Sequence, residues 1–451
     1  MNIRDRQIED TELIKYFKSQ LDQIRFIGTS ERLETKTKIN KLSDDNPLEE
    51  QRDRLLPLWT ALLGDAIVFL KQQDEREKYH DEEIYGVDDL SSYFEEIQDF
   101  EAILLGTVPA YRDHMTHAVR VFLLGEFMIR QSMGFQGVDC DDTPLRKGIS
   151  PDEKEAVWAI IALCHDLGYP VEAIRLLTKE SKQILESARF SIQELGYGLS
   201  PQFYTISEFT LRFIASSLMK MGGEKFAVHL QPKFFIKFAN ALDKYSHGVI
   251  SCLILMAKLV YFMESDYTTD RIKYLNELDA RQYLIRRTIL RAISSHDCDE
   301  IYHLRMNNFP FLLLICDEMQ EWGRPRLVDV FKRSIPTSKL TIRWLDEKKI
   351  DYEIEFSSEI PAVHDIKKEH VKAYFNKKKS KFIKVLRSAV GGKHRKLHLV
   401  FTVTDKTGPH VRSYRLCHLR PDRVEIEEPE TVFPAKITRK KSRRSTTVRS
   451  K

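Results

Sequence analysis

A strongly apolar segment that ends in two adjacent polar residues constrains this chain more than any other feature. Residues 158–164 read Trp-Ala-Ile-Ile-Ala-Leu-Cys, and residues 165–170 continue as His-Asp-Leu-Gly-Tyr-Pro. The apolar run predicts a buried helix, which Gly168 and Pro170 end. A buried imidazole and carboxylate need partners, because burying an unpartnered polar group is costly. The pair therefore predicts a ligand site at the end of a core helix.

Two further histidines lie at the start of a second apolar segment. His114 and His117 precede residues 118–124, whose apolar pattern predicts another helix. They stand three positions apart, so both lie on one helix face. Imidazole nitrogens and carboxylate oxygens are suitable ligands for borderline or hard divalent ions. The two segments together favour a metal site.

With these motifs the sequence resembles the HD superfamily of metal-dependent phosphohydrolases, whose ligands run His…His-Asp…Asp through a helical domain. His117 matches the first ligand, His165-Asp166 matches the doublet, and Asp317 in Leu-Leu-Leu-Ile-Cys-Asp matches the last. Two more histidines, His247 and His296, lie where the binuclear branch of the superfamily adds ligands. The resemblance spans residues 105–330.

The resemblance implies a hydrolase that uses one or two divalent ions, Mn, Mg, Fe or Co. A hydroxide would form on the ions near neutral pH, because the cations lower the pKa of bound water. It would attack a phosphate ester or phosphodiester, expected to be that of a nucleotide, so the enzyme would be a phosphodiesterase or nucleotidase. The implied ligands are His117, His165 and Asp317 for one ion and His247 and His296 for the other, with Asp166 bridging both and acting in catalysis.

Other residues near these positions are candidates for catalysis or substrate binding. His114 is a candidate general acid or substrate contact, although an ordinary residue on a helix surface is an equal alternative. Lys244 lies one turn before His247 and is a candidate catalytic cation. Arg112 and Arg324 are candidate substrate contacts, because guanidinium groups bind phosphate. For each of these three cations an ordinary surface residue is the favoured alternative.

The pattern leaves the substrate open. Cyclic-di-GMP phosphodiesterases of the HD-GYP branch carry a lysine after His-Asp-x-Gly, where this chain has Tyr169. Cyclic-nucleotide phosphodiesterases share the Leu-Cys-His-Asp-Leu context. Their upstream catalytic histidine, however, falls where this chain has Asp113. Neither branch is matched in full.

The competing hypothesis is a non-catalytic HD-type protein that senses a nucleotide or serves as a scaffold. Its C-terminal region would then bind a polyanion or a protein. The complete ligand set favours the enzyme, because a degenerate domain would be expected to lose ligands.

The chain divides into a helical part and a smaller mixed part. Apolar residues at helical spacing predict a mainly α fold up to residue 335, with few stretches that alternate as strands do. After Pro336 the pattern changes, and residues 339–345, 352–356, 397–403 and 411–416 alternate with period two around a helix at 371–390. We therefore expect an N-terminal helical region (1–100), an HD-type helical bundle domain (101–335), a small α+β domain (336–432) and a disordered basic tail (433–451).

The net charge of +4 hides two regions of opposite sign. Residues 351–451 contain 25 Lys+Arg against 12 Asp+Glu, whereas the rest of the chain is net acidic. Such a basic region can bind nucleic acid or an acidic protein. Because every implied ligand lies in the acidic part, we expect these cations to localise the enzyme or recruit a partner rather than to clamp the substrate phosphate.

The sequence predicts a cytoplasmic protein without membrane contact. The N-terminus MNIRDRQIEDTELIKYF is charged and lacks the apolar core of a signal peptide. The longest apolar stretch, residues 248–263, contains Lys258 and is shorter than the ~20 residues that a membrane span needs. The six cysteines are dispersed, without a CxxC pair, as expected of reduced thiols.

Overall fold

The computed structural model describes most of the chain between Ile8 and Glu428. The described residues are 8–28, 35, 38, 48–73, 86–107, 114–131, 145, 148–189, 200–263, 274–301, 308–322, 337–345, 349–357, 366–388, 398–406, 411–420 and 423–428. The statements below concern these residues.

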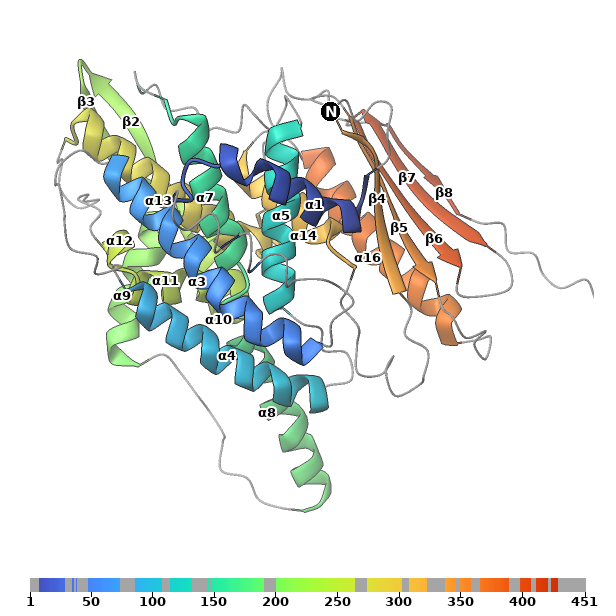
Figure 1. The fold of residues 1–451 in the computed structure, drawn as a ribbon. Helices are drawn as coiled ribbons and strands as arrows, with labels where there is room; N and C mark the ends of the chain where they lie inside the picture. Colours follow the sequence, from blue (N-terminus) through green and yellow to red (C-terminus); the bar gives the residue numbers. More distant parts are fainter. Residues whose placement is uncertain are drawn as a thin grey trace, which may run out of the picture.

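A helical part and a six-stranded sheet lie side by side (Figure 1). The helices are α1 (Asp10–Gln20), α3 (Leu48–Gln73), α4 (Val87–Thr107), α5 (Met115–Gln131), α7 (Pro151–Cys164), α8 (Tyr169–Ser187), α9 (Pro201–Ile214), α10 (Pro232–Asp243), α11 (His247–Lys258), α12 (Val260–Met263), α13 (Glu277–His296), α14 (Phe309–Met319) and α16 (Ile366–Ser388), with a 3-10 turn at Leu21–Gln23. The strands are β1 (Ile8–Glu9), β2 (Ser216–Gly222), β3 (Lys225–Leu230), β4 (Thr337–Leu345), β5 (Lys349–Ser357), β6 (His398–Lys406), β7 (Arg412–Arg420) and β8 (Arg423–Glu427).

Helix α7 is the core helix of the helical part and packs against α3, α5 and α13. Its residues from Ala156 to Cys164 are all buried. A capping box begins it: Ser150 Oγ accepts the Glu153 N–H at 3.2 Å, and the Glu153 carboxylate accepts the Ser150 N–H at 2.8 Å. Near the other end, the indole N–H of Trp59 donates to the Leu163 carbonyl at 2.8 Å. Helix α7 is therefore held at both ends, and its C-terminus lies deep in the protein.

A glycine allows α5 to lie against α7. A Cβ atom on Gly125 would lie 1.9 Å from the ring of Trp158, which is fully buried. The indole N–H of Trp158 also donates to the carbonyl of Phe122 on α5 at 3.0 Å. Because Gly125 has no side chain, α5 can lie this close to Trp158 of α7.

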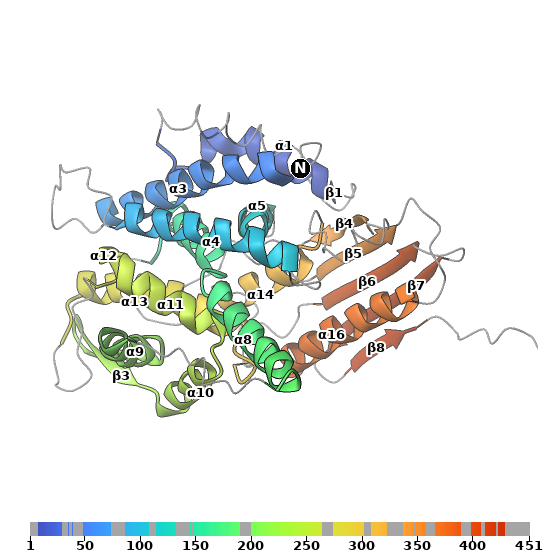
Figure 2. The ribbon, with the colours of Figure 1, turned by 90° about the horizontal axis from the view of Figure 1, so that it is seen from below.

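The sheet has the strand order β1-β4-β5-β6-β7-β8. All neighbours are antiparallel except β5 and β6, whose parallel pairing needs a crossover that α16 provides. Phe375 and Phe382 of α16 pack on Phe401 of β6, with ring centroids 5.8 and 5.6 Å apart. Figure 2 shows α16 lying along one face of the sheet.

Buried ion pairs join α16 to the helical part. The ammonium group of Lys378 lies 3.2 Å from a Glu321 carboxylate oxygen and contacts Glu318 as well. All three side chains are at least nine-tenths buried. Lys381 forms a second ion pair with Glu318. Since Glu318 belongs to α14, the sheet-bearing region is attached to the helices by charged contacts removed from water.

The expectation of a mainly helical protein with a small sheet-containing C-terminal region is confirmed, with three differences. A nearly all-helical region was expected over 101–335, yet β2 and β3 form an antiparallel hairpin there, turning at Gly222 and Gly223, both with positive φ. In addition, β1 pairs with β4, so the N-terminal region contributes one edge strand, and β8, which the alternation did not predict, pairs with β7 at the other edge. The basic tail predicted at 433–451 lies outside the described residues. The domain boundaries stay predictions.

Two apolar helical stretches, Leu55–Gln73 and Pro151–Arg175, would be long enough to cross a membrane by length and composition alone. Of the most apolar 18 residues in each stretch, 50% are buried inside the protein in the first and 67% in the second. A helix buried in a protein core has the same length and apolar composition as a membrane-spanning helix, so these two stretches do not distinguish the two cases. The cytoplasmic location and the absence of membrane contact stay predictions.

We expect Gly125→Ala to lower the free energy of unfolding by about 1–3 kcal/mol, because the added methyl group overlaps the buried Trp158 ring and overpacks the core. Gly148→Ala is the matched control, since a Cβ there meets nothing within 4 Å. Urea unfolding followed by circular dichroism measures both variants. Equal stability of the two variants would contradict the close packing of α5 on α7.

We expect Lys378→Met to destabilise the protein by about 3–5 kcal/mol, because it removes the buried cation that Glu318 and Glu321 share and leaves Glu318 with the more exposed Lys381. The control is Lys406→Met, which breaks the more exposed pair with Glu355 and should cost ~1 kcal/mol or less. Thermal unfolding measures the two variants. A loss no greater for Lys378→Met than for the control would show that the buried pairs do not hold the two parts together.

Candidate metal centre

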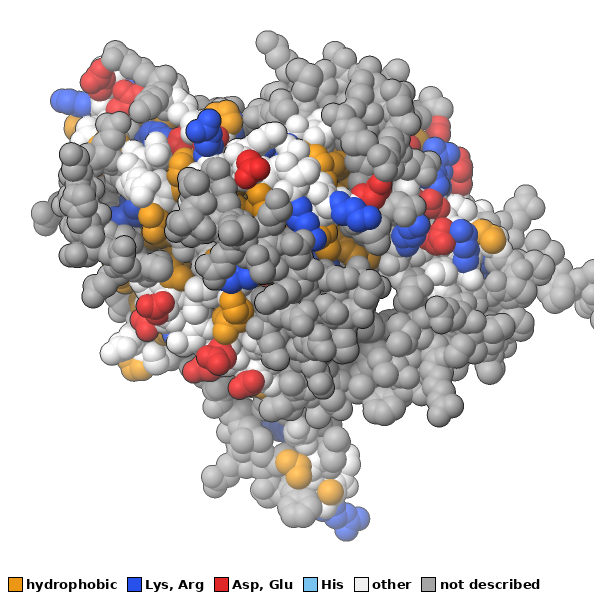
Figure 3. Space-filling view, in the orientation of Figure 1, with side chains coloured by type: hydrophobic (Ala, Val, Ile, Leu, Met, Phe, Trp, Pro, Cys, Tyr) orange, Lys and Arg blue, Asp and Glu red, His pale blue; other side chains and the backbone are white. Residues whose placement is uncertain are grey.

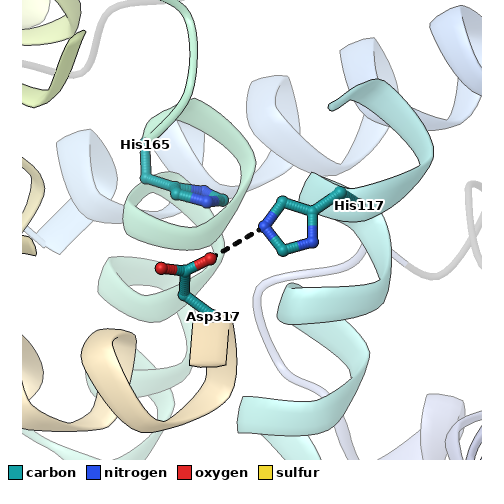
Figure 4. A group of neighbouring side chains, drawn as sticks. All are labelled: His117, His165 and Asp317. Carbon is teal, nitrogen blue, oxygen red and sulfur yellow. Dashed lines mark hydrogen bonds and ion pairs between the residues drawn. The ribbon is translucent and has the colours of Figure 1, made fainter. Parts of the chain in front are cut away.

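The structure brings all six residues of the predicted ligand set together from separate elements. They are His117 on α5, His165 at the C-cap of α7, Asp166 in the turn that follows, His247 at the start of α11, His296 at the end of α13 and Asp317 on α14. Figure 4 shows three of them, with His117 and Asp317 directed toward each other and the His165 ring beside them. The segments that carry the six residues are up to 200 positions apart in sequence.

Asp166 lies at the centre of the cluster, and its two carboxylate oxygens face different histidines. Oδ2 is 3.4 Å from Nε2 of His165 and 3.8 Å from Nε2 of His117. Oδ1 is 3.4 Å from Nε2 of His247 and 3.6 Å from Nε2 of His296. The carboxylate therefore stands between two pairs of imidazoles.

Each pair has its own further contacts. Asp317 Oδ1 lies 3.0 Å from His117 Nε2, on the Oδ2 side of Asp166. On the other side, the Nε2 atoms of His247 and His296 are 3.1 Å apart. Three groups of donor atoms, each within 4.8 Å of one another, could hold a metal ion here. They are His117, His165 and Asp317; His165, Asp166 and His296; and Glu172, His247 and Asp297.

The Nδ1 atoms of the four histidines all have acceptors. His165 donates to the Ala162 carbonyl at 2.8 Å, and His296 donates to the Ile293 carbonyl at 2.5 Å. Carbonyl oxygens only accept, so Nδ1 carries the hydrogen in both rings. The Nε2 atom, on the far side of each ring from this hydrogen bond, is consequently the atom that can bind a cation.

The acceptors for the other two rings are side chains. His247 Nδ1 donates to the Glu172 carboxylate at 2.7 Å. His117 Nδ1 contacts Oε1 of the buried Gln320, whose Nε2 donates to the Trp322 carbonyl at 2.8 Å. This second bond makes Oε1 the acceptor toward His117. Such outer partners orient ligating imidazoles in metal sites.

Electrostatics keeps the two carboxyl groups ionised. Burial alone raises the pKa of Asp166, but the surrounding histidines, His165 foremost, lower it well below its ordinary value. For Asp317, burial is likewise outweighed by the hydrogen bond to His117 and by the charge of Lys381, and its pKa is also lowered. Both groups are therefore anionic at neutral pH.

The histidines differ in their protonation. Burial lowers the pKa of His165 to about 4, so this ring is neutral at pH 7. Burial also lowers the pKa of His247, yet Asp297 and the hydrogen bond to Glu172 outweigh it and raise the pKa to about 9. The proton on His247 Nε2 can be donated to His296, and a cation bound there would displace it.

The donor set fits a divalent cation. Nε2 of His165 is buried and has no hydrogen-bond partner among the described residues, although its lone pair points at the carboxylates. Buried polar atoms without a partner are rare and call for an explanation. A cation held by these imidazoles and carboxylates would satisfy this atom and offset the charge of Asp166 and Asp317.

The turn that contains His165 and Asp166 packs closely against the start of α11. A Cβ on Gly168 would lie 2.3 Å from the carbonyl of His247, so only glycine fits where this turn meets α11. The Gly168 N–H donates to Ser251 Oγ at 2.8 Å, and the same hydroxyl lies 2.8 Å from the His165 carbonyl. The turn between α7 and α8 is thereby tied to the helix that begins at His247.

Five of the six residues, all but His165, line a cavity of about 480 Å³. One wall contains His114 and Tyr169, whose rings stack with centroids 3.6 Å apart. The backbone N–H of His114 donates to the buried Glu101 carboxylate at 2.9 Å, and its Nδ1 is 3.4 Å from the same oxygen. His114 is thus held toward the cavity from one turn before His117, as its position in the sequence suggested.

Lysines of the basic C-terminal region also line this cavity. We expected the cations of that region to localise the enzyme or recruit a partner rather than to clamp the substrate phosphate. Lys377, Lys378, Lys381 and Lys384 of α16 nevertheless line the cavity beside the candidate ligands. The sequence could not place them, because the contact between α16 and α14 depends on how the sheet packs against the helices.

The structure does not bring Lys244, the candidate catalytic cation, to the centre. The Lys244 side chain is 70% exposed, its ammonium group lies 3.4 Å from Glu300, and Lys244 does not line the cavity. Arg112 and Arg324 lie outside the described residues. Conversely, the sequence did not single out Glu172, Asp297 or Gln320 as partners of the histidines. Only the position of Asp297 directly after His296 offered a signal.

Comparisons of this chain with protein-family models, with curated proteins and with solved structures found no match. The site is therefore defined by its own geometry, as a cluster of histidines and aspartates that could hold a metal ion.

We expect His165→Ala to weaken Mn²⁺ binding by at least about 100-fold, because it removes a buried ligand whose Nε2 has no other described hydrogen-bond partner. Metal content after dialysis, and the rise in melting temperature when Mn²⁺ is added, measure the effect. His229→Ala, an exposed histidine on β3, is the matched control and should behave as the wild type. Wild-type metal content in His165→Ala would show that the ion binds elsewhere.

Proposed function

We propose that the protein is a metal-dependent phosphohydrolase of the HD type, which hydrolyses a phosphate ester or phosphodiester of a nucleotide. The observation that carries the proposal is the placement of the Asp166 carboxylate, with one oxygen toward each of two histidine pairs. A carboxylate in this position suits a bridge between two ions. The order of the ligands along the chain supports the resemblance to the binuclear branch of the HD superfamily.

The donor atoms suggest which ions bind and how they are divided. His117, His165 and Asp317 would hold one ion, and His247 and His296 would hold the other. Nitrogen and oxygen donors without a thiolate favour Mn, Fe, Co or Mg. Two ions at such a site would polarise the phosphoryl oxygens and promote ionisation of the attacking water.

The protein's own residues would position the substrate and move protons. Glu172 and Asp297 hold the His247 ring, with Nδ1 at 2.7 and 3.2 Å from their oxygens. Glu101 holds His114 at the cavity wall, where the imidazole can donate a proton to the leaving oxygen. The stacked Tyr169 ring beside it offers a surface for a nucleobase or sugar. A cavity of about 480 Å³ is of the size that small-molecule ligands occupy.

The proposal is tested by a hydrolysis screen of the purified protein over cyclic, linear and deoxynucleotides with Mn, Mg, Co and Fe. We expect turnover of at least one substrate. Asp166→Asn should lower it by at least about 100-fold, because it removes the central negative charge while keeping the side-chain shape. His229→Ala should retain full activity.

Two results would contradict the proposal. Full activity in Asp166→Asn would place the reaction elsewhere. Tight metal binding without turnover of any substrate in the panel would favour the competing function, a non-catalytic nucleotide sensor or scaffold.

A further inference from the structure

The basic wall of the cavity is built from one helix face. Lys377, Lys381 and Lys384 follow one another at intervals of four and three along α16, which aligns them on one side. Together with Lys378 they line the cavity that the candidate ligands also line. A row of ammonium groups and a metal centre thus share one cavity.

Two of these lysines are held by glutamates of the helical part. Lys378 and Lys381 both form ion pairs with Glu318, which directly follows Asp317, and Lys378 also pairs with Glu321. The two lysines and the two glutamates offset one another's charge. These contacts fix the position of α16 beside the candidate ligand Asp317.

The other two lysines are more accessible. The Lys377 side chain is exposed and forms no ion pair with any residue that the structure describes. Lys384 is 43% exposed, and it contacts the Asp299 carbonyl, while its ammonium group lies 3.8 Å from the exposed Asp299 carboxylate. Such long, solvent-screened ion pairs contribute little, so a ligand anion can compete for this ammonium group.

The Lys and Arg side chains of the sheet, unlike those of α16 that line the cavity, alternate with acidic side chains on the surface. Figure 3 shows Lys and Arg interspersed with Asp and Glu at the edge of the molecule where the sheet lies. Lys406 pairs with Glu355 at 2.7 Å, and Arg415 lies 3.8 Å from Glu427. This described face is a mixed-charge surface, whereas α16 directs its lysines into the cavity.

We infer that α16 forms the second phosphate-binding element of the site and that the substrate carries a chain of two or more phosphates. The inference rests on the proposed function. The phosphate that reacts binds at the His-Asp cluster, and Lys377 with Lys384 bind a neighbouring phosphate. Lysine binds phosphate as a mobile point charge, which suits a flexible phosphate chain.

The inference also assigns a role to the C-terminal region. Its helix completes the substrate site of the helical part, and the buried contacts of Lys378 keep it there. The sheet then acts as the support that orients α16, through the packing of Phe375 and Phe382 on Phe401.

The test is equilibrium binding of imidodiphosphate and of orthophosphate to the full-length, Mn²⁺-loaded protein by calorimetry. Imidodiphosphate presents two phosphates joined by a bridge that resists hydrolysis. We expect the Lys377→Gln/Lys384→Gln double variant to bind imidodiphosphate about tenfold more weakly, because it lacks two charge-assisted contacts. Its affinity for orthophosphate should change less than about twofold.

The matched control is Lys372→Gln, which removes an exposed lysine of α16 that pairs with Glu428 and does not line the cavity. It should bind both probes as the wild type does. An unchanged imidodiphosphate affinity in the double variant, or an equal loss in Lys372→Gln, would overturn the inference. So would a wild type that binds imidodiphosphate no more tightly than orthophosphate.

Metal content separates this inference from the proposed function. If the wild type binds no Mn²⁺ or turns over no substrate in the screen, the proposed function fails. If it binds Mn²⁺ and hydrolyses a substrate while the lysine substitutions leave imidodiphosphate binding intact, only the role of α16 fails. Unchanged melting temperatures of the lysine variants would exclude misfolding as the cause of any loss.

Discussion

The structure depends on the burial of the Asp166 carboxylate among four imidazoles. A buried charge is tolerated only when neighbouring groups compensate for its lost hydration. Here the rings of His117, His165, His247 and His296 surround it, and they come from different elements of the helical part. The packing of these helices is therefore tied to the geometry of the centre. Disturbing one helix would alter a ligand position as well as a hydrophobic contact.

The buried lysine of α16 extends this dependence to the C-terminal region. Glu318 follows the candidate ligand Asp317 on the same helix, and it is neutralised by Lys378 and Lys381 from α16. Moving α16 away would leave buried glutamates next to the centre without cations, at a considerable cost in free energy. The sheet-bearing region and the helices therefore share one electrostatic network around the cavity.

Some features of the fold and the site could be predicted from the sequence, and others could not. A ligand site at His165 and Asp166 was predicted because these polar residues end an apolar, buried helix, and buried polar groups need partners. The strands β4, β5, β6 and β7 followed from period-two alternation. The hairpin of β2 and β3 was missed because it interrupts a helical region with a short, partly exposed pair of strands. The edge strand β1 was missed because its two residues carry no periodicity.

The sequence by itself determined the chemistry available to this protein: a mainly helical core, a set of imidazoles and carboxylates, and a basic C-terminal region. Tertiary structure alone decided which of these groups meet. It turned Nδ1 of each histidine toward an acceptor and Nε2 toward Asp166, and it brought the α16 lysines to the same cavity. The sequence could not fix these contacts, because a local sequence pattern reports only which residues are buried and with what period. A contact such as that between His117 and Asp317, 200 positions apart, depends on how whole helices pack.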